Sequence, residues 1–319
     1  MAGPATVLAI SGGVGGAKLA LGLARELEPD ALAVLVNTAD DFCHLGLQIC
    51  PDIDTLLYTL SGRSNRSQGW GLEGESWQVM AALENLEGET WFRLGDRDLA
   101  THLWRTGRLA TGDSLSTATR ALASRMGVDV AVLPMSDDTV STWVHSDEGD
   151  LSFQRYFVQR GCEPKVNGFS FRGIEHAAPS PEVLQLLDSG RVAAVVICPS
   201  NPFVSVDPIL QLPGLWQMIA ALQVPVVAVS PIIAGQAVKG PAAKMLAELG
   251  LSVDAEAVIR HYNTHYPGLV DTFVIDEGDA TLAAAISELG VSVAVTDTMM
   301  RDISDKRRLA RFVLSRAGH

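Results

Sequence analysis

The sequence has few cysteines and no long apolar segment. Its four cysteines are scattered without any C-x-x-C pair, so neither a zinc ribbon nor a disulfide framework is indicated, and reduced thiols are the simplest interpretation. No apolar run approaches the roughly 18 residues that a membrane span needs. The N-terminus lacks the basic segment of a signal peptide. These absences predict a cytoplasmic protein with no membrane partner.

Positive charge is also scarce. The chain has 24 Lys and Arg residues against 37 Asp and Glu residues, which gives a formal net charge of −13. Such a surface repels nucleic acid, so we expect no nucleic-acid partner. A small anionic substrate stays possible if the site supplies local positive groups or a metal. With 319 residues, 47% of them hydrophobic, the chain can bury a large core in two domains or one large α/β unit.

Strands and helices are predicted to alternate through most of the chain. Residues 6–10 form an apolar strand, a glycine loop follows, residues 17–27 have a helical pattern, and residues 31–36 form a second strand. The later part repeats this order, with strands expected at 191–198, 224–230, 270–275 and 291–296 and helices at 181–189, 214–222, 241–249, 254–264, 280–289 and 302–316. Because the strands are continuously apolar, both faces of their sheet should be covered. The sequence therefore predicts an α/β fold with a Rossmann-like, doubly wound parallel sheet.

The middle of the chain has a different pattern. Residues 58–127 show helical patterns only, whereas residues 140–144 and 151–158 flank a turn and are typical of a β-hairpin. We therefore predict a core made of residues 1–57 and 128–319, with a hairpin at about 140–158. Residues 58–127 would form a helical insertion.

The loop between the first strand and its helix is rich in glycine. Such a loop lets the backbone approach an anion, and the N–H groups at the helix N-terminus point toward that anion. The loop lacks the spacing of a dinucleotide-binding fingerprint and of a Walker A loop, which argues against an NAD-dependent dehydrogenase. A tight packing turn is the alternative. The candidate anion-binding residues are Gly12, Gly13, Gly15, Gly16 and Lys18.

Polar residues also follow several other predicted strands. Asp40 and Asp41 come after the second strand, where paired carboxylates usually need a cation, although a solvated loop would also explain them. Asp52 is interpreted as a helix cap, and Asp54 in the same first turn could instead face the site. The remaining candidates are Asp96, Arg97 and His102 in the densest polar cluster, Ser200 and Asn201 after a later strand, and Lys239 before another helix. Surface ion pairs and proline-fixed turns are the structural alternatives for these residues.

Eight motifs occur in an order that resembles the phospholactate transferase family of coenzyme F-420 biosynthesis. The resemblance extends from Ile10 to about Thr298. The motifs are SGGVGGAK, VNTADDF, PDIDTLLYTLSG, RLGDRDLATHL, LPMSDD, CPSNPFVSVDPIL, AVSPIIAGQAVKGPAAKM and TDTMM.

The resemblance implies a specific reaction. The acceptor would be the deazaflavin Fo, whose ribityl hydroxyl attacks the phosphorus next to a three-carbon acid on a guanosine diphosphate-type donor. GMP would leave, and an upstream guanylyltransferase would supply the donor. The resemblance also implies Mg²⁺ as cofactor, a homodimer, and an acceptor site partly formed by the insertion.

The resemblance assigns the contacts with Fo position by position, whereas the assignments of the phosphate-binding residues rest on their expected place at the edge of the sheet. Asp54 and Arg97 match the family's Fo-contacting positions, and we expect Asp41 with them in catalysis. Asp41 and Asp54, with Asp40 nearby, are the predicted metal ligands. The glycine loop, Ser200, Asn201 and Lys239 would bind the guanosine phosphates, and Asp96 and His102 would also contact substrate.

Two questions stay open from sequence alone. The segment 68–71, QGWG, looks like the bacterial pattern and favours phosphoenolpyruvate as the acid, with 2-phospholactate and 3-phosphoglycerate as alternatives. A non-catalytic regulator that binds nucleotides or sugar nucleotides is the alternative function, because a related family shares the glycine loop. The LGDRD-x-ATH block argues against it, since a regulator needs no deazaflavin site.

Overall fold

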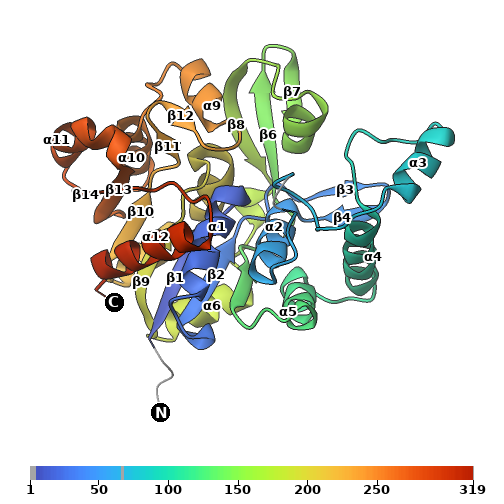
Figure 1. Cartoon of the computed structure of the whole chain (residues 1–319), viewed down its shortest axis with the longest axis horizontal. Helices are drawn as coiled ribbons and strands as arrows, with labels where there is room; N and C mark the ends of the chain where they lie inside the picture. Colours follow the sequence, from blue (N-terminus) through green and yellow to red (C-terminus); the bar gives the residue numbers. More distant parts are fainter. Residues whose placement is uncertain (1–4, 66–67, 319) are drawn as a thin grey trace.

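The centre of the protein is a seven-stranded sheet. The structure, a computed structural model, describes residues 5–65 and 68–318. The sheet has the order β14-β13-β10-β9-β1-β2-β5, and all its neighbouring strands are parallel (Figure 1). Its strands are β1 (Thr6–Ser11), β2 (Leu32–Val36), β5 (Ala131–Pro134), β9 (Val192–Ile197), β10 (Val226–Val229), β13 (Thr272–Asp276) and β14 (Ser292–Thr296). The predicted α/β class and parallel sheet are confirmed.

The strand order fixes where a ligand can bind. The chain starts at β1 in the middle, proceeds through β2 to β5 at one edge, then returns to β9 and proceeds to β14 at the other edge. The direction of winding therefore reverses between β1 and β9. In open α/β sheets the loops diverge at such a reversal and leave a crevice beyond the carboxyl ends of the strands. Here those two loops are the glycine loop and the segment after Ile197.

Helices cover both faces of the sheet, which explains the continuously apolar strands. Along β1, Leu8 and Ile10 pack into one buried cluster and Val7 and Ala9 into the other. Helices α1 (Gly13–Ala24), α2 (Pro51–Leu60), α5 (Leu115–Met126) and α12 (Ile303–Arg316) cover the Val7 face. Helices α6 (Pro181–Asp188), α8 (Leu215–Ala221), α9 (Ala242–Glu248), α10 (Ala255–His265) and α11 (Ala283–Ser287) cover the Leu8 face.

Two of the predicted helices have a different extent in the structure. Helix α1 begins at Gly13, so the loop glycines form its first turn instead of preceding it. The helix expected at 280–289 is divided into a 3-10 segment, Glu277–Leu282, and the short α11.

The predicted hairpin is present, but it belongs to a three-stranded antiparallel sheet. Strand β6 (Ser141–Ser146) pairs with β7 (Gly149–Ser152) and also with β8 (Val166–Arg172), which the sequence patterns did not reveal. The second strand ends at Ser152 and not at 158. Phe153 and Tyr156 are buried three residues apart, which is a helical spacing, and Arg155–Gln159 form a π-helical turn.

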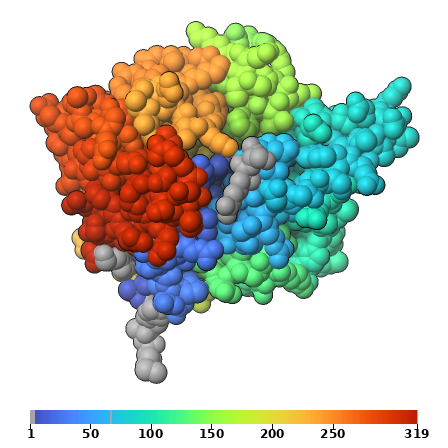
Figure 2. All heavy atoms as spheres, viewed as in Figure 1, coloured from blue at the N-terminus to red at the C-terminus, as the bar shows by residue number. Residues whose placement is uncertain are grey.

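The part of the chain that stands apart from the core is shorter than the predicted insertion, residues 58–127. Helix α2 crosses the predicted boundary at residue 58, and α5 packs on the sheet through Leu122 and Ala123. Only α3 (Gln78–Asn85) and α4 (Asp96–Ala110) stand apart with their connections, beside the short hairpin of β3 (Phe42–His44) and β4 (Leu47–Ile49). This part projects from the body (Figures 1 and 2) around a small apolar cluster of Ile49, Met80, Leu94 and Leu99.

Two smaller features complete the fold. A two-stranded hairpin, β11 (Ile232–Ile233) and β12 (Gln236–Ala237), follows β10, and the four-residue α7 (Asp207–Leu210) precedes α8. Within residues 5–65 and 68–318, no helix has the length and apolar character that crossing a membrane requires.

Candidate active site

The glycine loop packs directly against the loop that follows β9. The N–H of Gly12 donates to Ser200 Oγ at 3.1 Å. A Cβ atom at Gly15 would collide with the carbonyl oxygen of Pro199, and one at Gly16 would collide with the hydroxyls of Ser11 and Ser200. Only glycine permits this approach. The N-terminus of α1 therefore lies at the reversal point of the sheet, which is a geometry that favours anion binding.

A cavity of about 570 Å³ opens at this point. It brings together residues from the carboxyl ends of five strands and from the insertion. Those predicted as site residues are Gly12, Gly13, Gly15, Lys18, Asp40, Ser200, Asn201 and Lys239. Gly16 is buried directly behind them. The sheet topology thus gathers into one place residues that are up to about 230 positions apart, as expected for loops at the carboxyl edge.

The cationic side of the cavity contains Lys18, Lys239 and Arg93. Lys18 Nζ donates to the carbonyl of Met300 at 3.2 Å. Its pKa is lowered by burial and by the nearby charges of Lys239 and Lys306. Lys239 reaches across to the backbone of Gly69, where any Cβ would displace its ammonium group. Two ammonium groups that repel each other in a cavity are favourably placed to bind a polyanion such as a diphosphate.

The acidic side of the cavity is formed by Asp40 and Asp52. Asp52 Oδ1 accepts the N–H of Gly13 at 2.7 Å, and its Oδ2 accepts Asn37 Nδ2 at 3.0 Å. Burial raises the pKa of Asp52 to about 6. Burial and the neighbouring charge of Asp52 raise the pKa of Asp40 well above its ordinary value. Asp40 Oδ1 is buried and accepts no hydrogen bond from the residues that the structure describes.

Asp52 was missed as a site residue because its position also suits a helix cap. The side chain caps α1 by accepting the Gly13 N–H, instead of capping its own helix α2. Its motif contains two aspartates, and the pattern of apolar residues in α2 does not distinguish which of them faces the cavity. No signal in the sequence alone could have decided between them.

Asp54 lies away from the cavity, in a buried ion pair. Arg105 of α4 binds it with two parallel contacts, of which Nη1 to Oδ2 is 3.0 Å and the second joins Nη2 to Oδ1. His102 Nδ1 is 3.6 Å from Asp54, and His102 Nε2 is 3.3 Å from Asp98. Asp98 also accepts the hydroxyl of Tyr58 at 2.5 Å. This network joins α4 to α2, and desolvation makes its pairing essential.

Arg105 had no place among the predicted site residues. Asp98, His102 and Arg105 are separated by four and three residues, so they share one face of α4. That spacing was the available signal for a buried polar network.

The other predicted residues lie outside the cavity lining. Asp41 lines a second cavity of about 430 Å³, and burial raises the pKa of its carboxyl well above the ordinary value. Asp96 accepts the hydroxyl of Ser76 at 2.6 Å and the first N–H groups of α3. Arg97 Nη1 donates to the carbonyl of Glu73 at 3.0 Å.

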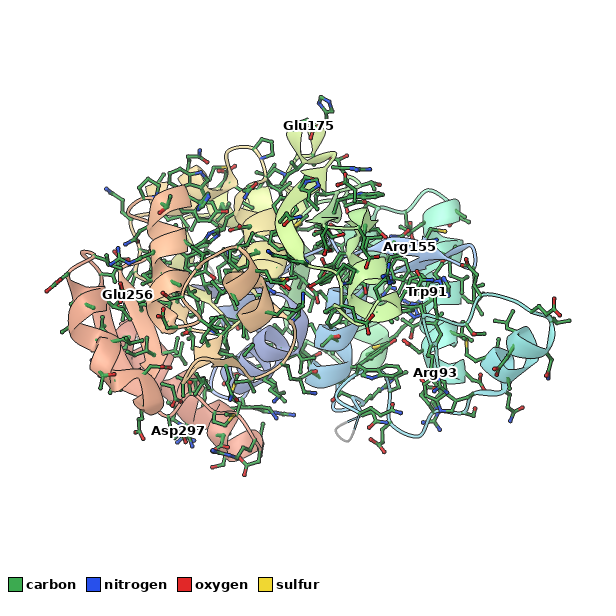
Figure 3. The ribbon with its side chains drawn as sticks, turned by 90° about the horizontal axis from the view of Figure 1, so that it is seen from above. Trp91, Arg93, Arg155, Glu175, Glu256 and Asp297 are labelled. Carbon is green, nitrogen blue, oxygen red and sulfur yellow. The ribbon has the colours of Figure 1, made fainter. Side chains whose placement is uncertain are left out.

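The wall on the insertion side is aromatic. Trp70, Trp91, Phe92, Phe153 and Phe157 line the cavity there. Trp70 and Phe157 are 44% and 38% exposed, and Phe153 stacks on Phe157 with ring centroids 5.4 Å apart. Figure 3 shows Trp91 and Arg93 on the insertion side of the molecule. Exposed aromatic rings beside a cavity suit a flat ring system in a ligand.

The carboxylates on the cavity are candidate ligands for a divalent cation. No group of three or more His, Cys, Asp or Glu side chains among residues 5–65 and 68–318 could hold a metal by itself. Asp40 and Asp52 are two buried carboxylates on one cavity, and one oxygen is unpartnered. Mg²⁺ commonly binds one or two carboxylates together with water and substrate phosphates. Asp40 and Asp52 fit such a site.

The chain is similar to known proteins over nearly its whole length. The family model described as "2-phospho-L-lactate transferase CofD" matches residues 7–307. The chain is 39% identical to a phosphoenolpyruvate transferase of Kitasatospora aureofaciens, over 98% of this chain and 97% of that protein. It is 38% identical to a 2-phospho-L-lactate transferase of Methanosarcina acetivorans, over 97% and 98% of the two chains.

A solved structure shows the same fold. It is a UPF0052 family protein from Bacillus halodurans, with a TM-score of 0.65 and 16% identity, covering 98% of this chain and 99% of that one. Because this identity is low, that likeness extends to the fold alone. The family match and the curated relatives both extend over nearly the whole chain, and the protein therefore belongs to the 2-phospho-L-lactate transferase family.

Proposed function

We propose that the protein transfers a phosphoenolpyruvyl group from a guanosine diphosphate-type donor to the ribityl hydroxyl of Fo and releases GMP. The observation that carries the proposal is that the glycine loop, two lysines and two carboxylates line one cavity, namely Gly12, Gly13, Gly15, Lys18, Lys239, Asp40 and Asp52. That arrangement suits a diphosphate and a divalent cation together. The names of the relatives, phosphoenolpyruvate transferase and 2-phospho-L-lactate transferase, support a three-carbon acid on the donor.

The proposed step is one substitution at phosphorus. A new O–P bond forms between the ribityl hydroxyl and the phosphorus that carries the three-carbon acid. The P–O bond to GMP breaks, GMP takes the bridging oxygen and its electron pair, and the hydroxyl proton is lost to a base. Such transfers depend on positioning and charge stabilisation. The N–H groups of Gly12 and Gly13 are already bonded to Ser200 and Asp52, so the following N–H groups in the first turn of α1 would hold the donor's phosphates together with Lys18 and Lys239.

Mg²⁺ completes the proposal as cofactor. When bound, it would neutralise phosphate charge as the leaving group departs. Asp40 and Asp52 are the carboxylates on the cavity that would hold it. Asp41 and Asp54 were the expected metal ligands, with Asp40 nearby. Asp41 lies in the second cavity and Asp54 pairs with Arg105, so Asp52 takes their place in the proposed site.

The aromatic wall is the proposed acceptor side. Trp70, Trp91 and Phe157 offer ring faces and edges to a deazaflavin. Arg97, by resemblance, would contact Fo, although it lies outside the cavity lining. Arg97→Lys tests this role, because the two N–H groups of the guanidinium fork are lost. Weaker Fo binding in a fluorescence titration would support it, and unchanged affinity would contradict it. We also propose that the protein is a homodimer and that it acts in the cytoplasm.

One assay tests the transferase and its donor together. The protein is incubated with Fo, Mg²⁺, GTP and the upstream guanylyltransferase, in parallel with phosphoenolpyruvate, 2-phospholactate or 3-phosphoglycerate. The product masses are then measured, and reactions without guanylyltransferase serve as the control. We expect one product, with phosphoenolpyruvate. If no acid gives a product while the guanylyltransferase is active, the protein is instead a nucleotide-binding regulator.

A further inference from the structure

Three segments of the cavity wall meet at one buried amide, Asn37. The residue follows β2 and has no exposed surface. Its Oδ1 accepts the N–H of Ala39 at 3.0 Å. Its Nδ2 donates to Asp52 Oδ2 at 3.0 Å and to the carbonyl of Val204 at 3.3 Å. These contacts join the loop after β2, the start of α2, and the segment after β9.

The chemistry of these partners requires an amide. The Ala39 N–H needs an acceptor, while the Asp52 carboxylate and the Val204 carbonyl need donors, so only one orientation of the amide satisfies all three. Aspartate at this position would offer no donor. Serine has one hydroxyl on a shorter side chain, and glutamine is longer by one methylene. The position therefore constrains both the chemistry and the length of the side chain.

The amide also restrains the acidic side of the cavity. With Oδ2 held by Asn37 and Oδ1 held by the N–H of Gly13, the carboxylate of Asp52 cannot rotate. Asp40 lines the same cavity with one oxygen unpartnered. Because Asp52 also holds the first N–H of α1, a change in its position would move the glycine loop. The carboxylate pair and the glycine loop form one connected unit.

We propose that Asn37 is a positioning residue that orients Asp52 toward a divalent cation and, through Gly13, shapes the glycine loop for a nucleoside diphosphate. The identities of the cation and the nucleotide rest on the proposed function. Residues that hydrogen-bond to metal ligands without touching the metal commonly change metal affinity by about 10- to 100-fold when they are replaced. Through its contact with Asp52, Asn37 would influence the binding of both the cation and the nucleotide.

The test compares Asn37→Ser with a matched variant, Asn263→Ser. The serine hydroxyl at 37 can still accept from the nearby Ala39 N–H, but it is too short to hold Asp52. Asn263 lies on α10 outside the cavity, and its Nδ2 donates to one carbonyl, that of Leu289, at 3.2 Å. Mn²⁺ binding is measured from the free-ion electron paramagnetic resonance signal. GDP binding is measured by calorimetry with no acceptor present.

We expect Asn37→Ser to bind Mn²⁺ about 10- to 100-fold more weakly and GDP about tenfold more weakly, whereas Asn263→Ser binds both as the wild type does. Wild-type affinities in Asn37→Ser would overturn the inference. Equal losses in both variants would also overturn it, because they would indicate general destabilisation.

A second variant, Asn37→Asp, keeps the shape of the side chain if the serine variant does not fold. It places a third carboxylate beside Asp40 and Asp52, so Mn²⁺ should raise its thermal midpoint more than that of the wild type. An equal rise would contradict the proposed position of the cation. The transfer assay is independent of these measurements. If the wild type forms product but Asn37→Ser binds Mn²⁺ as tightly as the wild type does, this inference alone is refuted. If the wild type forms no product but Asn37→Ser binds Mn²⁺ more weakly, the proposed function alone is refuted.

Discussion

The buried ion pair between Asp54 and Arg105 provides a quantitative test of how the insertion is held on the core. Only 1% of the Arg105 side chain and 6% of the Asp54 side chain are exposed. Arg105→Met keeps an unbranched apolar side chain on α4 but removes the cation. Asp54 would then be a buried carboxylate without a cationic partner, close to His102 and near the Asp98 carboxylate. We expect the free energy of unfolding to fall by about 3–5 kcal/mol.

Two further variants separate this effect from a general loss of charge. Arg120→Met removes an exposed ion pair on α5, where Arg120 Nη1 is 3.1 Å from Glu182 Oε1 and 66% of the arginine side chain is exposed. Its loss should cost less than about 1 kcal/mol. The double variant Arg105→Met, Asp54→Leu removes both buried charges and fills their space with apolar atoms. It should recover much of the stability that Arg105→Met loses.

The assay is urea unfolding followed by tryptophan fluorescence, with all four proteins at one pH. The reasoning would be refuted if Arg105→Met and Arg120→Met lost the same small amount. It would also be refuted if the double variant were less stable than Arg105→Met. Either result would mean that the desolvated Asp54 carboxylate does not need its partner.

Three other predictions test the cavity. The pKa of Asp52 is about 6 in the folded protein against an ordinary value of 3.8. The folded state therefore holds this proton more tightly than the unfolded state does. The stability that this proton contributes is fully present below about pH 3.8 and is lost as the pH rises through about 6. Without divalent cation, the unfolding free energy of the wild type minus that of Asp52→Asn should therefore fall by about 2 kcal/mol from about pH 4 to about pH 7, and a constant difference in urea titrations would contradict this. Gly15→Ala and Gly22→Ala each place a methyl group against a backbone carbonyl oxygen, so both should destabilise the protein by about 1–3 kcal/mol. Calorimetry should show weaker GDP binding only for Gly15→Ala. Equal GDP affinity in the two variants would exclude the glycine loop from the nucleotide site. Lys239→Met should weaken GDP binding about tenfold. Lys165→Met should not, because Lys165 is exposed and lies outside the cavity. If Lys165→Met weakened GDP binding more than Lys239→Met in the same titration, Lys239 would be excluded as a phosphate ligand.

The elements of the fold were largely predictable because their signals are local. Each sheet strand is a short apolar run, and each covering helix has apolar residues at helical spacing, so neither depends on distant contacts. The third strand of the small sheet, β8, was not predictable in this way. Its sequence, VNGFSFR, contains a glycine and has only two buried residues, Val166 and Phe171. Its strand conformation depends on pairing with β6.

The candidate site was predictable as a location more than as a set of side chains. Loops after parallel strands share one edge of a sheet, and this placed the glycine loop, Asp40, Ser200 and Asn201 on one cavity. The positions of the exposed Arg97 and the half-buried Asp96 were less predictable. Both residues contact residues 73–79 of the projecting insertion and do not line the cavity. The aromatic wall comes from separate segments of the chain, and no single motif contains it.

The sequence alone determined the alternation of strands and helices in most of the parallel sheet, the close approach of the glycine loop, and the motifs that place the chain in its family. Tertiary packing decided which carboxylate of each pair reaches the cavity. Residues 52 and 54 are two positions apart on α2 and project about 200° from each other around the helix. The rotation of α2 against α1 therefore directs Asp52 to the Gly13 N–H and Asp54 to Arg105. That rotation is set by the buried side chains Ile53, Leu56 and Leu57 packing against the core, and the motif that contains them does not show which side chains they pack against.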